Sequence, residues 1–381
     1  MKYIIGGKII TPDGIVTGCT LAYDEKITGI TNDALIPSVA EVINAEGHYI
    51  SPGFIDIHMH GYMGEDVSDG KAEGLQIIAG GIIENGVTSF LPTTMTVSED
   101  EINAAFDAVR SVKEKSRNWT GAEILGVHAE GPFINPSKKG AQAAENIKKP
   151  DAAFVLKNAD IIKTLTLAPE TDDGHACIKE LAAKTDILLS LGHTDASYEE
   201  AISAIEDGVS HVTHLFNAMS PLNHRNPGVV GAALTSDVSC ELIADTFHIH
   251  PALFSFVAGL KQQKLVLITD CTRAGGMPDG EYTLGGQPIY LNGIECRLED
   301  GTIAGSVLRL NKAVDNVLKH TGLSIDTVVN MVTINAARVI HEDDRIGSLE
   351  VGKDADIVIF DDEINILKTI KGGRKIYTTE K

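Results

Sequence analysis

Cysteines are few in this sequence, and nothing in their spacing suggests a cross-link. The 381 residues contain five cysteines, which are odd in number and scattered, and no two form a Cys-x-x-Cys pair. A disulfide framework or a cysteine-rich zinc site would need paired, closely spaced cysteines. We therefore expect reduced thiols and a cytoplasmic protein. The five residues are Cys19, Cys177, Cys240, Cys271 and Cys296.

Positive charge and long apolar stretches are also lacking. Lys and Arg number 32 against 53 Asp and Glu, which makes the formal net charge -21. Nucleic acids and anionic membrane surfaces need a basic footprint, so we exclude both as partners. A small anionic substrate stays possible, because it needs only one or two local cations. No stretch approaches the 18 apolar residues of a membrane span, and the N-terminus lacks the apolar region of a signal peptide.

The composition is that of a globular protein, with 43% hydrophobic and 22% charged residues. The length allows one large domain or two smaller ones. Residues 1–51 and 345–381 both contain short strand-like segments separated by turn signals, whereas the middle of the chain does not. We predict that the two ends pair into one small β-sandwich domain, with residues 52–344 inserted between them as a second domain.

The middle of the chain alternates between apolar, strand-like runs and helical segments. Ser98 with Glu101, and Ser197 with Glu200, form capping boxes that begin two of the helices. The segment between the sixth and seventh runs is interpreted as a long polar loop with no clear helix. Eight strands alternating with helices over this length predict a (β/α)₈ barrel. The runs are 54–60, 87–93, 124–131, 164–170, 187–193, 211–217, 240–249 and 264–270.

Histidines and carboxylates gather at the ends of these runs. Active sites of such barrels lie at the carboxyl ends of the strands, so these side chains should converge. Each histidine alone is explained more simply as a hydrogen-bonded core residue, but the group together favours a site for one or two Zn²⁺ or Fe²⁺ ions. The candidate ligands are His58, His60, Glu130, His193, His214 and Asp270. His128 is spaced to face the same way as Glu130 and is a candidate for supporting a ligand.

Several motifs carry a resemblance to a known family. They are "PGFIDIHMHG", "HAEGPF", "LGHTDA", "THLFNAM", "IADTFHIHP" and "ITDC", with "GSLEVGKDADIVIFD" near the C-terminus. Together they resemble the amidohydrolase superfamily and, within it, the N-acetylglucosamine-6-phosphate deacetylases. The first motif is typical of the whole superfamily, whereas "EGPF" and "HLFNAM" followed by "HRNPG" are far more specific to the deacetylases. The similarity runs nearly from end to end.

The resemblance implies a metal site and a role for each ligand. Glu130, His193 and His214 would hold the ion that all such enzymes share, and His58 and His60 would complete a second position. Many hydrolases of the superfamily bridge two metals with a carboxylated lysine. Glu130 takes that position here, which argues against a dihydroorotase or a hydantoinase.

The implied reaction is metal-dependent hydrolysis of an acetamide. Bound metal would activate water and polarise the carbonyl, while Asp270 would take the proton from water and return it to the departing amine. The products would be acetate and glucosamine 6-phosphate, as in amino-sugar catabolism and cell-wall sugar recycling. Arg225 would bind the phosphate, reaching the neighbouring active site of a homodimer. The resemblance assigns substrate contacts to Ala141, Gln142, Asn217, Ala218, Arg225, His248, Ile303, Ala304 and Gly305.

Two alternatives stay open at the level of sequence. The substrate could be N-acetylgalactosamine 6-phosphate, because the two sugars differ at one hydroxyl. The protein could also be a sugar-phosphate binder without catalysis, whose metals are structural. Structural zinc sites are usually cysteine-rich, and the candidate ligands here contain no cysteine and retain an aspartate suited to proton transfer.

Overall fold

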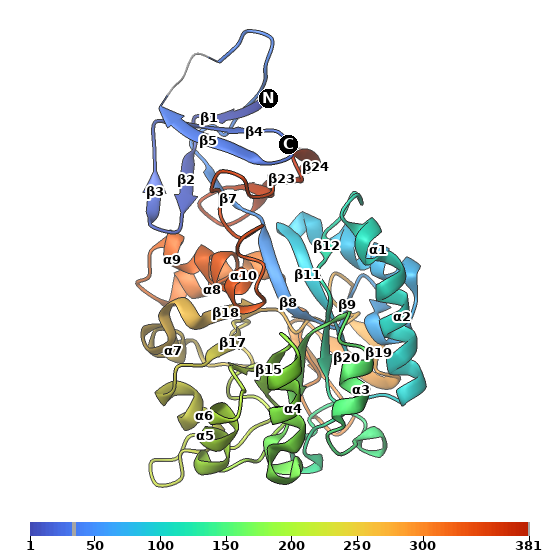
Figure 1. The fold of residues 1–381 in the computed structure, drawn as a ribbon. Helices are drawn as coiled ribbons and strands as arrows, with labels where there is room; N and C mark the ends of the chain where they lie inside the picture. The colour runs from blue at the N-terminus through green and yellow to red at the C-terminus, as the bar shows by residue number, and fades with distance from the viewer. Residues whose placement is uncertain (33–35, 380–381) are drawn as a thin grey trace.

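The computed structural model describes residues 1–32 and 36–379 and consists of a barrel with a smaller β-rich part at one end (Figure 1). Both ends of the chain lie in the smaller part, where blue and red segments meet. Helices surround the strands of the larger part. This arrangement confirms the predicted fold class, a (β/α)₈ barrel with a small β domain.

Eight parallel strands form the barrel, each next to its neighbour in chain order. Most are fully buried, which explains their nearly continuous apolar sequences, because both faces of a parallel sheet are covered. The ring closes where the Asp270 amide donates a hydrogen bond to the His58 carbonyl at 2.9 Å. The strands are β8 (Phe54–Met59), β11 (Val87–Thr94), β13 (Val127–Glu130), β14 (Ile162–Leu167), β15 (Leu188–Leu191), β16 (His211–Val212), β17 (Ser239–Ile243) and β18 (Leu265–Ile268).

Helices follow each strand and pack outside the ring (Figure 1). Both predicted capping boxes are present, with Ser98 beginning α2 and Ser197 beginning α5. The helices that follow the barrel strands are α1 (Ala72–Ile82), α2 (Glu99–Ser116), α3 (Ala152–Lys157), α4 (Ala176–Lys184), α5 (Tyr198–Glu206), α6 (Gly228–Thr235), α7 (Phe254–Lys261) and α8 (Leu310–His320). Two short helices, α9 (Ile325–Asn330) and α10 (Ile334–Val339), come after them.

Three strand or helix predictions need correction. The run 211–217 is a strand only at His211–Val212, and the run 124–131 divides into β12 (Glu123–Ile124) and β13. The interval interpreted as a loop without a clear helix contains α6, in which residues 228–233 are all buried. Its sequence is almost uniformly apolar, so it has no polar face and no amphipathic period that sequence reading could detect.

The small part is a sandwich of two sheets whose inner faces share an apolar core. Ile4 and Leu21 from one sheet pack in this core with Ile50 and Ile357 from the other. The two chain ends join where β22 pairs antiparallel with β7. One sheet contains β1 (Lys2–Ile5), β4 (Cys19–Tyr23), β5 (Ile27–Asn32) and β6 (Glu41–Asn44); the other contains β2 (Lys8–Thr11), β3 (Gly14–Val16), β7 (Tyr49–Pro52), β22 (Ile357–Phe360), β23 (Ile366–Lys371) and β24 (Arg374–Thr378). The boundaries at residues 51 and 345 stay a prediction.

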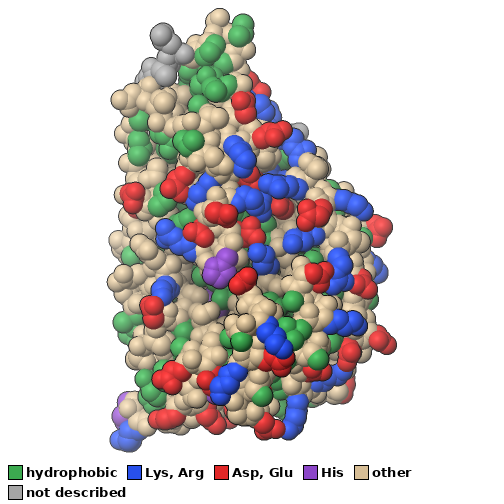
Figure 2. All heavy atoms as spheres, viewed as in Figure 1, with side chains coloured by type: hydrophobic (Ala, Val, Ile, Leu, Met, Phe, Trp, Pro, Cys, Tyr) green, Lys and Arg blue, Asp and Glu red, His purple; other side chains and the backbone are tan. Residues whose placement is uncertain are grey.

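Two additions interrupt the barrel pattern near its carboxyl end. A hairpin of β9 (Gly61–Tyr62) and β10 (Glu65–Asp66) follows β8. A three-stranded sheet of β19 (Gly280–Leu284), β20 (Gln287–Asn292) and β21 (Glu295–Arg297) follows β18 and leads into residues 302–305 at the cavity. On the face that Figure 2 shows, Lys and Arg side chains lie among Asp and Glu. In the described ranges, no helix combines the length and apolarity needed to cross a membrane.

Candidate active site

The six predicted ligands meet at the carboxyl end of the barrel. Each is nearly or fully buried, and five of them line a cavity of about 270 Å³, while His58 lies beneath it. The structure groups them into two sets whose ligand atoms lie within 4.8 Å of one another. One set is Glu130, His193 and His214, and the other is His58, His60 and Asp270. The prediction that these side chains converge is therefore confirmed.

The first set comes from β13 and from the segments after β15 and β16. His214 Nε2 lies 3.1 Å from Glu130 Oε1 and 3.2 Å from His193 Nε2. His193 Nε2 lies 3.3 Å from the same Glu130 oxygen. Two nitrogens and one oxygen thus form a triangle with nearly equal sides.

The second set lies beside the first and shares Glu130 with it. His60 Nε2 is 3.2 Å from Asp270 Oδ1 and 3.3 Å from Glu130 Oε2. His58 Nε2 is 3.5 Å from Asp270 Oδ1 and 3.4 Å from Glu130 Oε1. Glu130 Oε1 therefore faces His193 and His214 of the first set as well as His58, and Oε2 faces His60, so this carboxylate can serve both sets.

These spacings fit divalent metal ions. Bonds of 2.0–2.1 Å in a tetrahedral site place neighbouring ligand atoms about 3.3 Å apart, close to the separations in both sets. His58 Nε2 is buried without a hydrogen-bond partner, which is rare unless something else satisfies the atom. Imidazole nitrogens with carboxylate oxygens are the donors that borderline metals such as zinc and iron accept. The residues present therefore fit one or two such ions.

Hydrogen bonds set which nitrogen of each ring faces the site. His60 Nδ1 lies 3.2 Å from the Thr93 carbonyl, and His193 Nδ1 lies 2.9 Å from the Lys138 carbonyl. A carbonyl oxygen only accepts, so each Nδ1 donates its proton and leaves a lone pair on Nε2. The Nε2 atoms of His193 and His214 lie 3.2 Å apart. Lone pairs on both nitrogens would repel each other, and a cation between them removes that repulsion.

Charge in the site favours a cation as well. Burial lowers the pKa of His58, but Glu241, Glu130 and Asp270 outweigh it and raise that pKa to about 9, so the carboxylates favour a cation at Nε2, either a second proton or a metal ion in its place. Burial raises the pKa of the Glu130 carboxyl, but the neighbouring His193 and His58 hold it well below its usual value. The carboxylates therefore stay ionised and attract positive charge to this end of the barrel.

Backbone conformation places three of the ligands. His193, His214 and Asp270 each lie two residues after the end of their strand and have φ values of 50°, 28° and 52°. Left-handed backbone is uncommon for residues other than glycine, and strained backbone clusters at functional sites. Each strand therefore ends in the same kind of sharp turn, which brings its ligand to the mouth of the barrel.

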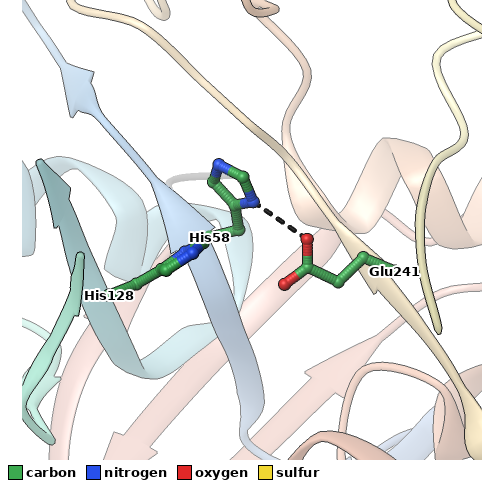
Figure 3. A group of neighbouring side chains, drawn as sticks. All are labelled: His58, His128 and Glu241. Carbon is green, nitrogen blue, oxygen red and sulfur yellow. Dashed lines mark hydrogen bonds and ion pairs between the residues drawn. The ribbon is translucent and has the colours of Figure 1, made fainter. Parts of the chain in front are cut away.

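Sequence reasoning missed Glu241, which contacts two of the predicted ligands. It lies in β17, is completely buried, and accepts a hydrogen bond from His58 Nδ1 at 2.9 Å (Figure 3). It also contacts His211 and the backbone of His214. One signal for it was available in the sequence, namely a single acidic residue in the apolar run "CELIA". A charge in a buried strand needs a partner, so this residue indicated a buried polar contact.

His128 lies beside the site without facing it. Its Nε2 lies 2.7 Å from Thr166 Oγ1, its Nδ1 lies 3.4 Å from Thr93 Oγ1, and its ring packs edge-on against His58 with centroids 4.4 Å apart. Burial, with the nearby His58, lowers the pKa of His128 to about 3, so the ring is neutral. The contact with His58 is one of ring packing alone, so the supporting role expected for His128 stays a prediction.

Seven of the nine predicted substrate contacts line the cavity, and Ala304 and Arg225 do not. Ala304 is buried outside it, and Arg225 is exposed. Gln142 lines the cavity with its amide already engaged, donating to Glu130 Oε2 at 2.7 Å and accepting from the Thr96 amide at 2.6 Å. The residues in the lining are Ala141, Gln142, Asn217, Ala218, His248, Ile303 and Gly305.

His248 is oriented by a carboxylate that sequence reasoning did not single out. Asp245 Oδ2 lies 2.6 Å from His248 Nδ1, and Asp245 Oδ1 accepts the backbone amides of Phe247 and His248. The carboxylate therefore fixes the ring so that its other nitrogen is available to the cavity.

Barrel fold and ligand cluster together define the class of metal-dependent hydrolases built on (β/α)₈ barrels. The model of the amidohydrolase family matches residues 49–378, and the chain belongs to that family. N-acetylglucosamine-6-phosphate deacetylase of Bacillus subtilis (strain 168) is 39% identical over 375 residues, which cover 96% of this chain and 94% of that protein. N-acetylgalactosamine-6-phosphate deacetylase of Escherichia coli O157:H7 is 34% identical, with 87% and 89% covered.

A solved structure extends the similarity to three dimensions. The crystal structure of N-acetylglucosamine-6-phosphate deacetylase from Pasteurella multocida superposes with a TM-score of 0.94 at 31% sequence identity, covering 99% of this chain and 100% of that one. The similarity therefore includes the small β-rich part as well as the barrel. The resemblance that the motifs carry is confirmed.

Proposed function

We propose that this protein hydrolyses the acetamide of N-acetyl-D-glucosamine 6-phosphate to D-glucosamine 6-phosphate and acetate. The observation that carries the proposal is the pair of ligand sets around Glu130 and Asp270, in a chain that is 39% identical to a deacetylase of this sugar over nearly its whole length. A divalent metal held by these residues would act as a Lewis acid and would lower the pKa of water.

The chain's own residues would handle the protons and orient the substrate. Asp270 lines the cavity, and although burial raises the pKa of its carboxyl, His58 and His60 lower it below the usual value. It is therefore an ionised acceptor, able to take a proton from the attacking water and return it to the nitrogen as the C–N bond breaks. His248, fixed by Asp245, is placed to hold the carbonyl oxygen or a sugar hydroxyl.

Acetate release tests the proposal directly. Protein purified anaerobically would be assayed on the gluco and galacto forms of the N-acetylated sugar 6-phosphate, with metal content measured on the same sample. We expect turnover of both to require metal and the gluco form to have the higher kcat/KM. Preference for the galacto form would support the second candidate, which the 34% identical Escherichia coli relative favours. Absence of acetate release from either sugar would support a binding protein without catalysis.

The phosphate group of the proposed substrate needs a cation to bind it. Among the described residues that line the cavity there is no Lys or Arg, so the substrate's negative charge has no cation from the lining. Arg225 is exposed in the polar segment before α6, and a guanidinium suits a phosphate because it can donate two parallel hydrogen bonds. We propose that Arg225 reaches the cavity of a second copy in a homodimer.

Mixing two impaired variants tests this, at a substrate concentration well below the KM of Arg225→Ala. Arg225→Ala should raise KM for the phosphorylated sugar at least about tenfold, with much less effect on the unphosphorylated sugar, because only the charged hydrogen bonds are lost. Subunit exchange with Asp270→Asn should restore activity, since one site of the mixed dimer has Asp270 and receives Arg225 from its partner. If exchange is shown to occur but no activity returns, Arg225 does not act across an interface.

The nature of the metal and the location of the protein are proposals too. Zn²⁺ and Fe²⁺ both suit histidine and carboxylate ligands, and metal analysis of the anaerobic preparation distinguishes them. A cytoplasmic location rests on the scattered cysteines alone, and fractionation of cells that express the protein would test it.

A further inference from the structure

Glu241 accepts three hydrogen bonds, from β8, from β16 and from the turn that follows β16. It is the charged residue of β17 (Ser239–Ile243), and none of its surface is exposed. Oε2 lies 2.9 Å from His58 Nδ1 and 3.1 Å from the His214 backbone nitrogen, and Oε1 lies 3.2 Å from His211 Nε2. A carboxylate with two oxygens can accept all three protons, whereas a neutral amide cannot.

The contact with His58 decides which of its nitrogens can bind metal. Because Glu241 accepts the proton of Nδ1, the lone pair of the ring is on Nε2. That atom faces Glu130 and Asp270 at 3.4 and 3.5 Å and has no hydrogen-bond partner. If the proton moved to Nε2, His58 could no longer serve as a ligand on that side.

The contact with His214 holds the other ligand set in place. The His214 amide donates to Glu241, and the φ of that residue is 28°, a conformation that needs support from its surroundings. His214 Nε2 in turn lies 3.1 Å from Glu130 Oε1. One oxygen of Glu241 therefore holds one residue from each ligand set.

A third metal position is the competing interpretation, because His58, His128 and Glu241 also offer ligand atoms within 4.8 Å of one another. Figure 3 shows the three side chains, with a dashed line only between His58 and Glu241. The 2.9 Å between those two is the length of a hydrogen bond. His128 is engaged with the hydroxyls of Thr166 and Thr93. His58 and Glu241 are therefore joined by a hydrogen bond, and His128 packs beside them, held by the two threonines.

We infer that Glu241 is the positioning residue that makes the second metal position usable, by directing His58 Nε2 toward His60 and Asp270. This inference rests on the metal-dependent activity proposed above. It predicts that the number of ions bound by the protein depends on a side chain that touches neither metal nor substrate.

Glu241→Gln is the primary test. Glutamine keeps the size of the side chain but replaces one acceptor oxygen with a donor, so His58 and His211 cannot both donate to it. A neutral amide oxygen also holds the Nδ1 proton of His58 less strongly than a carboxylate does. We expect the variant, loaded with Zn²⁺ and freed of excess ion, to bind about one ion per chain, compared with about two in the unaltered protein. The affinity of the lost position should fall about tenfold or more, and the absorption spectrum of the Co²⁺-loaded protein should lose the contribution of that position.

His128→Asn is the matched control. His128 is as deeply buried as Glu241 and touches the ring of His58, but it donates no hydrogen bond to a ligand. We expect this variant to keep about two ions per chain. Equal metal loss in both variants would overturn the inference, because it would show a general effect of disturbing the packing around His58.

Two further results would also overturn it. One is a folded Glu241→Gln protein with two ions of unchanged affinity. The other is an unaltered protein that binds a single ion under saturating Zn²⁺; acetate release by that protein would leave the proposed deacetylation standing. If Glu241→Gln does not fold, His211→Gln carries the test, since of the three bonds to Glu241 it disturbs only the one to Oε1. We then expect the second ion to bind a few fold more weakly, and unchanged affinity would overturn the inference.

Discussion

At the scale of single residues, the site depends on where protons are held. His60 and His193 each donate one proton to a backbone carbonyl, and His58 donates one to Glu241. The remaining lone pairs point at Glu130 and Asp270, so the interior of the site is rich in acceptors, with Gln142 donating to Glu130. Such an arrangement suits a cation, and it leaves Asp270 as the ionised group at the cavity that can accept a proton.

Asp270→Asn tests that role. An amide side chain cannot accept and return the proton, so we expect kcat for acetate release to fall about 10²- to 10⁴-fold. The ion held by Glu130, His193 and His214 should remain, because none of those side chains changes. Steady-state kinetics with metal analysis of the same preparation would check both expectations. A variant with kcat close to the unaltered value would show that another group transfers the proton.

At the scale of elements, each ligand-bearing turn is positioned by a buried strand, and each strand is covered by a helix. Helix α2 shows how local sequence builds this layer. Ser98 accepts the Glu101 amide and Glu101 accepts the Ser98 amide, which satisfies two of the free donors at the helix start. Its buried face includes Ile102, Phe106 and Val109, spaced as the sequence predicted.

Ser98→Ala should weaken the protein without changing its chemistry. The lost cap leaves a backbone donor unpaired, so we expect the free energy of unfolding to fall by about 1 kcal/mol and kcat to be unaffected. Ser111→Ala in the same helix is the control, since the Ser111 hydroxyl bonds only to the Ala108 carbonyl within the helix and alanine favours helix. Chemical denaturation of both variants measures the difference. Equal losses in the two would argue against a capping contribution.

At the scale of the whole molecule, charged residues join the small β-rich part to the barrel. Arg345 lies 3.0 Å from Glu123 and 2.8 Å from Asp354, and these three side chains are mostly buried. Asp356 next to them accepts the Gly372 amide at 2.8 Å. Burial raises the pKa of the Asp356 carboxyl from 3.8 to about 7, despite that hydrogen bond.

Asp356 should therefore make stability depend on pH. Its folded pKa lies above its unfolded pKa, so its stabilising contribution is complete below about pH 4 and is lost as the pH rises through about 7. Asp356→Asn does not titrate. We expect the unfolding free energy of the variant relative to the unaltered protein to rise with pH between about 5 and 7, by at most about 1.4 kcal/mol per pH unit.

Denaturation curves at several pH values measure this slope. Asp362→Asn is the control, because the Asp362 side chain is 80% exposed and pairs only with Lys8 at the surface. It should give a flat difference over the same range. A flat difference for Asp356→Asn as well would mean that this carboxyl is ionised in the folded protein at pH 5.

The amino-acid sequence alone was sufficient for the barrel, for the small β-rich part and for the convergence of the six predicted ligands. Apolar runs alternating with helices determine a (β/α)₈ barrel, because parallel strands buried on both faces need helices between them. The carboxyl ends of such strands meet at one rim, so His58, Glu130 and His214 could be brought together before any coordinates. Helix α6 was not predicted, because a uniformly apolar segment shows no alternation of apolar and polar residues at helical spacing.

Only the tertiary structure could decide which side chains support the ligands. Glu241 is 183 residues from His58 along the chain, and nothing local to either residue encodes that contact. The contacts of Gln142 were likewise not predictable from the sequence. Its amide bonds to Glu130, at the end of β13, and to Thr96, just after β11. Ligand identity follows from strand position, which is a local property. Ring orientation and proton placement follow from contacts between distant segments, which exist only once the barrel closes.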